Sequence, residues 1–382
     1  MTAAPAAPAA PEAPAAPAAP AAAAATGAAA LRAFTFPGLT TRVLFGSGTL
    51  ALAGEEVRRL GHGRALVLST PQQKPQAEAL AAALGGLAAG VFAGAAMHTP
   101  VAVTETALAA FRDSGATCLV ALGGGSTTGL GKAIALRTGA DQVVIPTTYA
   151  GSEMTDILGE TAGGQKTTRR DPAIRPEVVI YDVDLTLTLP PALTVTSALN
   201  AIAHAVEALY APDRNPVIEL MCREALPVFR DALPRVLAAP QDRAARAEVL
   251  YAAWLCSTAL GYASMALHHK LAHVLGGTFD TPHAETHAIL LPHTAGFNAA
   301  AAAAELAPVA AAFGATPGAG LWDFARACGA PLALRDLGLT PADLDRAAGI
   351  AVANPYRNPR AFTRADIRAL LQAAWEGRRP PH

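Results

Sequence analysis

The feature that most constrains the fold is a change of hydrophobic period near Leu189. Before it, short apolar runs typical of buried strands alternate with segments of helical spacing. These runs are RALVLST (64–70), TCLVAL (117–122), QVVIP (142–146) and VVIYD (178–182). After it, Ala, Leu and Val recur at helical spacing to the C-terminus. Because apolar strands that alternate with helices are typical of a parallel sheet covered on both faces, we expect an α/β N-terminal domain and an all-α C-terminal domain.

The chain of 382 residues is long enough for two domains, each with its own core. We place the α/β domain at residues 31–186 and the helical domain at residues 187–382. Residues 1–30 are rich in Ala and Pro, with Pro at every third position from Pro5 to Pro20. This pattern blocks a helix and offers no large side chain for burial, so we predict a disordered tail. The cleft between the two domains is the expected ligand site.

Charge and cysteine content narrow the class of protein. The chain has 29 basic and 30 acidic residues and no block rich in Lys or Arg, so it shows no footprint for nucleic acid or an anionic membrane. Its four cysteines are far apart and form no CxxC pair, which is typical of free thiols in a reducing cytoplasm. The N-terminus lacks the basic region of a signal peptide. We therefore expect a cytoplasmic protein with a small-molecule partner.

A glycine-rich stretch follows the strand predicted at residues 117–122. Gly123, Gly124 and Gly125 lie where that strand should lead into a helix, and Ser126 and Thr127 add hydroxyl groups. Glycines let backbone amides approach a pyrophosphate, and a helix N-terminus favours its negative charge. The pattern GxGxxG is absent, and a tight strand–helix turn is the alternative. We predict a dinucleotide-binding, Rossmann-like sheet.

Two further strand ends bear on the cofactor. Thr147, Thr148, Tyr149 and Ser152 follow the strand at residues 142–146, at the carboxyl edge where open α/β sheets bind ligands. An ordinary polar connection remains the alternative. The strand at residues 64–70 continues into Pro71, Gln72 and Gln73 without a carboxylate, so a ribose 2′-phosphate is not repelled and NADPH could bind as well as NADH.

The histidines give the sharpest functional signal. Six of the ten lie within 26 residues, and buried imidazoles need hydrogen-bond partners, so a purely structural role is hard to satisfy. His269 and His273 are one helical turn apart, as are Asn200 and His204, and Glu207 shares a face with His204. The six are His268, His269, His273, His283, His287 and His293. We expect most of them to form a catalytic or binding site.

These segments together resemble a known superfamily, the iron-containing alcohol dehydrogenases, whose fold is like that of dehydroquinate synthase. The resemblance rests on GGGS (123–126), PTTYAGSE (146–153), NAIAHAVEALYA (200–211) and the histidine segment (268–293). Within the superfamily the sequence looks like the maleylacetate reductases, through MHTPVAVTE (97–105), GGGSTTGLGK (123–132), QKTTRRD (165–171) and GGTFDTPHAETHA (276–288). The likeness runs from about Phe34 to the C-terminus and excludes the tail.

The resemblance also implies where a metal would bind. Metal-dependent relatives hold their ion with one Asp and three His, and the corresponding positions here are Asn200, His204, His269 and His283. Their glycine loop has an Asp where this chain has Gly129. Asn replaces the only anionic ligand with a weak neutral oxygen, although three histidines and water can hold Zn²⁺. We expect no catalytic metal.

The activity implied is reduction, by NADH or NADPH, of the carbon–carbon double bond of maleylacetate to 3-oxoadipate in the catabolism of aromatic compounds. Hydride would add to the alkene carbon β to the ketone, and an enolate would then need hydrogen bonding and a proton. The catalytic candidates are Asn200, His204, His269, His273 and His283; the substrate-binding candidates are Lys166, Lys270, Tyr149 and Glu285. Arg169 and Arg170 could also meet a carboxylate. The family implies a homodimer.

Two other functions stay open at this stage. One is a metal-dependent NAD(P) alcohol dehydrogenase of the same fold that acts on a small alcohol or aldehyde. The other, a non-catalytic nucleotide-binding protein, is disfavoured by the complete histidine set. The sequence does not decide between NADH and NADPH, nor between substituted maleylacetates.

Overall fold

The computed structural model describes residues 34–163, 165–314 and 316–381, apart from the side chains of Gln165 and Lys166. Residues 35–382 form one compact unit. The tail predicted for residues 1–30 lies outside the described residues. The division into two domains between residues 186 and 187 stays a prediction.

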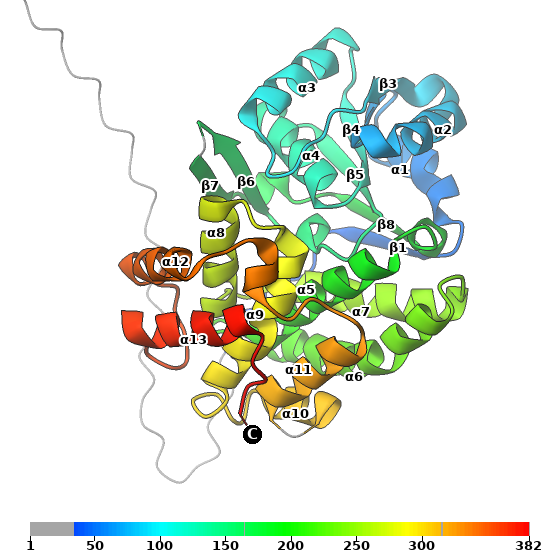
Figure 1. Cartoon of the computed structure of the whole chain (residues 1–382). Helices are drawn as coiled ribbons and strands as arrows, with labels where there is room; N and C mark the ends of the chain where they lie inside the picture. Colours follow the sequence, from blue (N-terminus) through cyan, green and yellow to red (C-terminus); the bar gives the residue numbers. More distant parts are fainter. Residues whose placement is uncertain (1–33, 164, 315, 382) are drawn as a thin grey trace, which may run out of the picture. The chain divides into compact units, whose positions relative to one another are not determined.

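Six parallel strands form the main sheet, in the order β1-β8-β5-β4-β2-β3 (Figure 1). Neighbouring strands pair in parallel along the whole sheet. The four apolar runs predicted β2, β4, β5 and β8, and β1 and β3 complete the sheet. The strands are β1 (Arg42–Gly46), β2 (Ala65–Leu68), β3 (Ala88–Phe92), β4 (Cys118–Gly123), β5 (Asp141–Pro146) and β8 (Val178–Asp182).

Helices cover both faces of this sheet. Alternate residues of β4 and β5 point to opposite sides, so Val120 and Val143 pack with α1 (Ala53–Arg59) and α2 (Lys74–Leu84). Leu119 and Val144 face the other way, toward α3 (Val101–Asp113) and α4 (Gly125–Thr138). This two-sided burial explains why the strands read as continuous apolar runs rather than as alternating ones.

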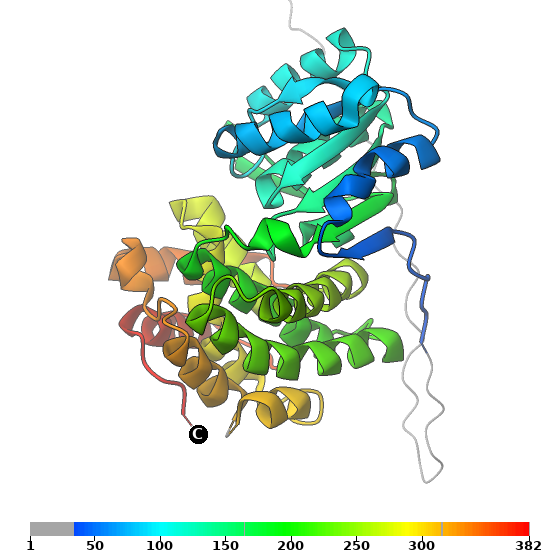
Figure 2. The ribbon, with the colours of Figure 1, turned by 90° about the vertical axis from the view of Figure 1, so that its right-hand side faces the viewer.

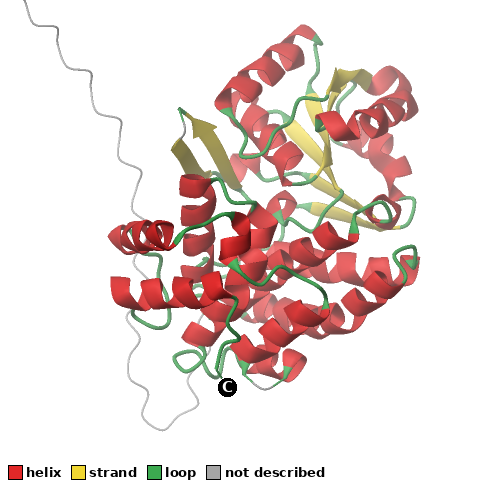
Figure 3. Cartoon of the chain, viewed as in Figure 1, coloured by secondary structure: helices red, strands yellow, loops and turns green. Residues whose placement is uncertain are grey.

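A second sheet is not predicted by the sequence. β6 (Ile157–Ala162) and β7 (Gln165–Arg170) pair antiparallel as a small hairpin beside the main sheet (Figure 3). The basic residues Lys166, Arg169 and Arg170, which from the sequence we would place in a loop, therefore lie in strand β7. Its charged and hydroxyl side chains lack the apolar alternation that marks a half-buried strand, which is why it reads as a loop.

Helices make up the rest of the chain, on one side of the sheet half (Figure 2). The long α5 (Pro191–Leu209) is central and buried from Thr194 onward. It packs against α6 (Pro216–Ala238), α7 (Arg243–Tyr262) and α9 (His283–Asn298). The others are α8 (Leu267–Phe279), α10 (Ala307–Phe313), α11 (Pro317–Ala327), α12 (Pro341–Ala353) and α13 (Arg364–Glu376). Short 3-10 turns are η1 (Thr49–Leu52), η2 (Pro71–Gln73), η3 (Gly85–Leu87), η4 (Ser152–Met154), η5 (Pro172–Ile174), η6 (Val183–Thr186) and η7 (Leu334–Leu337).

Helix α5 has the length and apolarity of a membrane span, but 89% of its apolar window is buried inside the fold. That burial is typical of a core helix. Helices α7 and α8 meet the same criterion only when taken together, and they are bent by 92° relative to each other. All four cysteines are free and buried, as expected.

Hydrogen bonds fasten the loop after β5 to α5. The backbone N–H of Tyr149 donates to Ser197 Oγ at 2.9 Å, and Asn200 Nδ2 donates to the Ala150 carbonyl at 3.4 Å. The Tyr181 hydroxyl donates to Glu153 Oε1 at 2.9 Å, and Ser257 Oγ donates to the same oxygen at 3.3 Å. The carboxyl edge of the sheet is thereby held against the helical half.

Candidate active site

Helix α5 carries Asn200, His204 and Glu207 at one-turn spacing, and all three side chains are buried. Asn200 Oδ1 and His204 Nδ1 are buried and make no hydrogen bond within the described part of the chain. Gly151 lies against His204 so closely that a Cβ at this glycine would come within 2.9 Å of His204 Cε1. The loop after β5 and the α5 face thus share one site.

Glu207 caps the N-terminus of α8 instead of projecting into open space. Its carboxylate accepts hydrogen bonds from the backbone N–H groups of Ala266 and His268, both at 2.8 Å, and from His269 Nδ1 at 2.7 Å. The Tyr210 hydroxyl at 3.2 Å and the backbone N–H of His269 at 3.4 Å complete the five donors. Burial opposes the charged carboxylate, but the hydrogen bond and charge of His269 hold the pKa of Glu207 below its usual value.

Imidazole rings from three helices gather around this carboxylate. The ring centroid of His269 lies 5.2 Å from that of His204, 4.9 Å from that of His287 and 6.0 Å from that of His273. His283 follows at 4.4 Å from His287. We call His204, His268, His269, His273, His283 and His287 the histidine cluster. His293, the sixth histidine of the segment, is buried but makes no ring contact with the cluster among the described residues.

The inner rings of the cluster are held neutral. Burial, followed by the neighbouring imidazoles, lowers the pKa of His204 and of His287 well below the ordinary value. Burial and the proximity of His269 lower the pKa of His268 to about 3. Neutral rings can accept and donate hydrogen bonds at once, which suits proton handling better than a cationic cluster would.

The four positions that hold iron in metal-dependent relatives fit an ion poorly here. Asn200 brings no charge, and the Glu207 carboxylate beside His269 is already engaged by five donors. His283 lies exposed at the start of α9, while His204 and His269 are buried. Across the described ranges, no group of three or more His, Cys, Asp or Glu side chains is arranged to bind a metal.

The glycine loop between β4 and α4 has the geometry of a phosphate cradle. Gly123 has φ +154°, and a Cβ there would lie 2.4 Å from Thr127 Oγ1; a Cβ at Gly124 would approach the Thr148 side chain to 3.1 Å. Thr127 Oγ1 is itself buried without a partner in the described chain. Gly125 and Ser126 form the first turn of the 14-residue α4, whose free amides favour an anion.

Two further contacts, at Gly129 and Thr147, define the surroundings of the glycine loop. Gly129 is pressed against Thr99, because a Cβ there would come within 2.4 Å of Thr99 Oγ1, so the place where metal-dependent relatives carry Asp is closed. Thr147 Oγ1 accepts a hydrogen bond from Gln73 Nε2 at 3.0 Å, which links the ends of β5 and β2.

Ser152 has a structural partner that the sequence did not reveal. The buried Lys132 ammonium donates to the Ser152 carbonyl at 2.5 Å, to Ser152 Oγ at 3.2 Å and to Thr155 Oγ1 at 2.8 Å. Burial lowers the pKa of Lys132 to about 7, with nearby Glu153 opposing this change. Ser152 therefore serves first to shape the loop, and its cofactor role stays a prediction.

The four substrate-binding candidates are scattered. The Tyr149 side chain is fully buried in the core near Arg246, away from the histidine cluster, so direct substrate contact is not supported. Glu285 is partly exposed in the first turn of α9, and Lys166 lies in β7 with a side chain outside the described residues. Arg170 pairs with Asp156 at 3.0 Å.

Lys270 reaches the cluster through a residue that sequence reasoning missed. Its ammonium lies 5.3 Å from the centroid of the Tyr356 ring, and the Tyr356 hydroxyl lies 3.4 Å from His273 Nδ1. Asn358 anchors this loop by exchanging hydrogen bonds with Asn298 at 2.9 and 2.7 Å. The paired Asn-Pro motifs of NPYRNPR (354–360) were the available signal for an ordered loop here.

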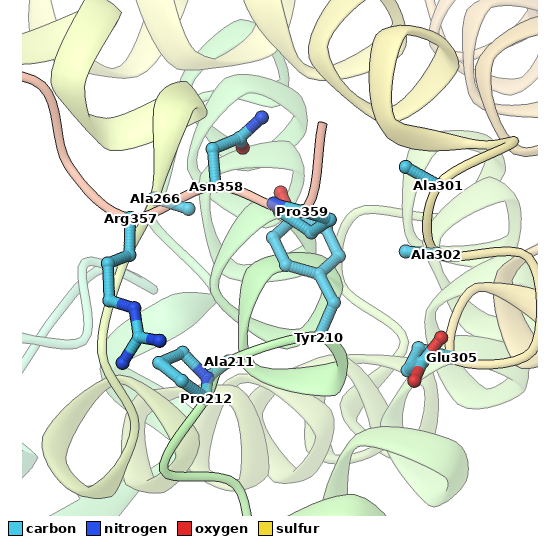
Figure 4. Close-up of a pocket in the computed structure, with 10 residues that line it drawn as sticks. All are labelled: Tyr210, Ala211, Pro212, Ala266, Ala301, Ala302, Glu305, Arg357, Asn358 and Pro359. Carbon is cyan, nitrogen blue, oxygen red and sulfur yellow. The ribbon is translucent and has the colours of Figure 1, made fainter. Parts of the chain in front are cut away.

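A cavity of about 200 Å³ is lined by residues of the helical half, among them Tyr210 and Ala266 (Figure 4). It meets the site through Tyr210 and Ala266, both of which contact Glu207. Its lining residues are Tyr210, Ala211, Pro212, Ala266, Ala301, Ala302, Glu305, Arg357, Asn358 and Pro359. A larger cavity of about 760 Å³, around Arg170 and Arg175, likewise contains no residue of the cluster.

Comparisons with known proteins agree with this architecture. Residues 40–183 match the iron-containing alcohol dehydrogenase family, and residues 194–375 match its C-terminal domain. The chain is 59% identical to maleylacetate reductase of Rhizobium sp. strain MTP-10005 over 92% of this chain and 100% of that protein. It is 50% identical to maleylacetate reductase 1 of Rhodococcus opacus over 91% of this chain and 98% of that protein.

A solved structure supports the same family and fold. The crystal structure of maleylacetate reductase from Agrobacterium tumefaciens superposes with a TM-score of 0.89 at 60% identity, covering 92% of this chain and all of that one. The expected dehydroquinate synthase-like arrangement of a parallel sheet followed by helices is thereby confirmed. The chain belongs to the iron-containing alcohol dehydrogenase family, in its maleylacetate reductase branch.

Proposed function

We propose that the chain reduces the carbon–carbon double bond of maleylacetate to 3-oxoadipate with NADH or NADPH, in the degradation of aromatic compounds. The observation that carries this proposal is the histidine cluster, whose inner rings His204 and His287 are held neutral, set directly against the loop after β5 at the carboxyl edge of the parallel sheet. The identity to maleylacetate reductases over nearly the whole described chain supports the choice of substrate.

The cofactor's pyrophosphate would lie on the first turn of α4, over Gly124, Gly125 and Ser126. The nicotinamide end would then reach the loop at Thr147–Gly151, beside Asn200 and His204. The end of β2 leads into Pro71–Gln73 without a carboxylate, so a 2′-phosphate meets no negative charge. We therefore propose that both reduced nicotinamides are accepted.

A reduced nicotinamide, when bound, would supply the hydride for the alkene carbon β to the ketone. Negative charge then develops on the ketone oxygen. A His269 ring that carries both protons would stabilise this charge, because its Nδ1–H donates to Glu207 and its buried Nε2–H, unpartnered among the described residues, is left for the oxygen. The carbon next to the ketone finally takes a proton. His273 and the exposed His283 are the candidates, since both can be reprotonated from solvent.

The substrate's carboxylates need a cationic partner. Lys270 is placed for one of them, with its ammonium over Tyr356 at the edge of the cluster. An alkene conjugated to a ketone is already activated, so the hydrogen bonds of the cluster replace the strong Lewis acid that a simple carbonyl would require. This reasoning, together with the poor metal geometry, supports a reaction that does not depend on a metal.

The test is consumption of reduced nicotinamide by purified protein given freshly made maleylacetate, before and after exhaustive chelation. Turnover that survives chelation is the expected result. Loss of activity that Zn²⁺ or Fe²⁺ restores would show that Asn200 is tolerated in a working metal site. Turnover of small alcohols but not of maleylacetate would instead favour an alcohol dehydrogenase.

We also propose that the protein acts in the cytoplasm as a homodimer, without a nucleic-acid or membrane partner. Its near-equal numbers of acidic and basic residues and the family's homodimers support this view. Light scattering during gel filtration would measure the mass of the assembly, and a monomer would contradict the proposal.

A further inference from the structure

Two chains of buried polar groups end at the histidine cluster. In the first, Glu207 accepts the hydrogen bond of His269 Nδ1 at 2.7 Å. In the second, His268 Nδ1 lies 3.0 Å from Thr294 Oγ1, and His268 Nε2 lies 2.8 Å from His287 Nδ1. Each chain ends in a buried nitrogen, His269 Nε2 or His287 Nε2, that has no hydrogen-bond partner within the described residues.

The direction of the second chain follows from Thr294. Its Oγ1 lies 3.0 Å from the Leu290 carbonyl and 3.1 Å from the Leu291 carbonyl, and carbonyl oxygens can only accept. The single hydroxyl proton is therefore committed to α9, and Oγ1 must accept from His268 Nδ1–H. A neutral His268 then offers a lone pair at Nε2, so His287 must carry its proton on Nδ1.

This arrangement leaves His287 Nε2 unprotonated, with a lone pair that can accept a hydrogen bond. Both rings are buried, and neither forms a hydrogen bond with a carboxylate in the described structure, which agrees with their neutral state. The first chain has a carboxylate at its other end, so a His269 ring that carries both protons donates from Nδ1 to Glu207 and from Nε2 to a bound group. The two Nε2 atoms belong to rings whose centroids are 4.9 Å apart.

We propose that Thr294 and His268 are positioning residues that fix the tautomer of His287, and that His287 Nε2 is a hydrogen-bond acceptor for the oxygen that His269 serves as donor. Transfer of the His269 Nε2 proton to the enolate oxygen would turn that oxygen from an acceptor into an enol hydroxyl that donates to His287 Nε2. The proton would return to His269 Nε2 when the enol carbon is protonated and the product ketone forms. A donor and an acceptor side by side can hold the oxygen in both forms. This inference rests on the proposed reduction of a conjugated ketone and names the groups that hold the ketone oxygen.

The first test reads the tautomers directly and needs no substrate. In protein labelled with ¹⁵N at histidine, His268 and His287 should each show a protonated Nδ1 and an unprotonated Nε2. In Thr294→Val, which keeps the shape but removes the acceptor, both rings should shift toward the other tautomer. A protonated Nε2 on His287 in the unmodified protein would overturn the proposal.

The second test is kinetic. Thr294→Val should lower kcat about tenfold or more while leaving the KM for the reduced nicotinamide unchanged, and Thr294→Ser should restore kcat because it keeps the hydroxyl. Thr258→Val is the matched control, since the buried Thr258 also bonds to a carbonyl of its own helix, that of Trp254 at 2.9 Å, in α7. Unchanged kcat in Thr294→Val would overturn the catalytic role of the chain.

The two tests also separate this inference from the proposed function. Correct tautomers in a protein that does not turn over maleylacetate would overturn the proposed function alone. Turnover of maleylacetate with a protonated His287 Nε2 would overturn only the inference about His287.

Discussion

At the scale of single residues, Glu207 has a different role in the fold from the one that its place in the sequence suggests. In the sequence it shares a helix face with His204 and resembles part of a ligand set. In the fold its carboxylate closes the N-terminus of α8 and orients His269. The helix N-terminus and the imidazole both favour the charged form, which is why a buried carboxylate can remain ionised.

Glu207→Gln tests this role. The amide replaces one accepting oxygen by a donor, so it faces at least one N–H group that it cannot satisfy. We expect kcat to fall by about 10–100-fold and the free energy of unfolding to fall by about 1–3 kcal/mol. Steady-state kinetics and denaturant unfolding measure both.

The control for this variant is Glu177→Gln, because Glu177 also accepts a backbone hydrogen bond, from the Gln142 N–H at 2.7 Å, but does so between strands of the sheet. Glu177→Gln should have a lower free energy of unfolding and an unchanged kcat. An unchanged kcat in Glu207→Gln would contradict the orienting role.

Lys270→Ala tests the proposed carboxylate contact. A charge-assisted hydrogen bond contributes about 1.5–3 kcal/mol, so the KM for maleylacetate should rise by about 10–100-fold. Tyr356→Phe keeps the ring under the ammonium and removes only the hydroxyl near His273, so it should change kcat more than KM. Equal KM values for the unmodified protein and Lys270→Ala would remove Lys270 from the site.

At the scale of elements, a strand–loop–helix unit forms the proposed cofactor site. β4 ends at Gly123, and α4 begins at Gly125 after an extended Gly124, so the backbone turns sharply at the carboxyl edge. The apolar runs predicted β2, β4, β5 and β8 within one or two residues of their bounds. The β6–β7 hairpin was not predicted because its strands are polar. Their pairing depends on contacts that a local sequence pattern does not indicate.

Gly123→Ala tests the cradle. The residue combines φ +154° with a Cβ position 2.4 Å from Thr127 Oγ1, so Ala would move the loop that faces the pyrophosphate. We expect the KM for reduced nicotinamide to rise about tenfold or more and unfolding to become easier by about 1–3 kcal/mol. Gly139→Ala, at the other end of α4 with φ +71° and open space around it, should cost only about 1 kcal/mol and leave KM unchanged.

At the scale of the whole molecule, buried imidazoles link stability to pH. His293 is buried outside the cluster, and burial lowers its pKa from 6.5 to about 4. Because the folded pKa is depressed, the unfolded chain takes up the proton first as pH falls below 6.5. Stability is therefore lost between pH 6.5 and 4, and this residue contributes no further loss once the folded state is protonated too.

His293→Gln removes this contribution. At about 1.4 kcal/mol for each unit of pKa, the acid-dependent loss from His293 is roughly 3 kcal/mol. The free energies of unfolding of the two proteins should therefore converge or cross as pH is lowered from 7 to 4, as measured by denaturant unfolding at several pH values. Parallel curves would show that His293 is not held neutral in the folded state. The kcat for maleylacetate should stay unchanged at neutral pH.

The sequence by itself determined the features that depend on local pattern. Hydrophobic period located four strands of the parallel sheet and the helical half, glycine spacing located the loop that we propose holds the pyrophosphate, and the density of histidines located the cluster. These follow because helix and strand periods and backbone freedom act over a few residues. The substitutions at Asn200 and Gly129 were equally visible, and the family resemblance gave them meaning.

Only the tertiary structure decided which groups touch. Glu207 meets His269 across 62 positions, and Tyr356 meets His273 across 83, so both contacts depend on how helices and loops pack. Packing also buried Tyr149 away from the site and engaged Ser152 with Lys132. The roles of the individual histidines follow from the same cause, because a tautomer is set by the partner of the other ring nitrogen, and that partner is supplied by the fold.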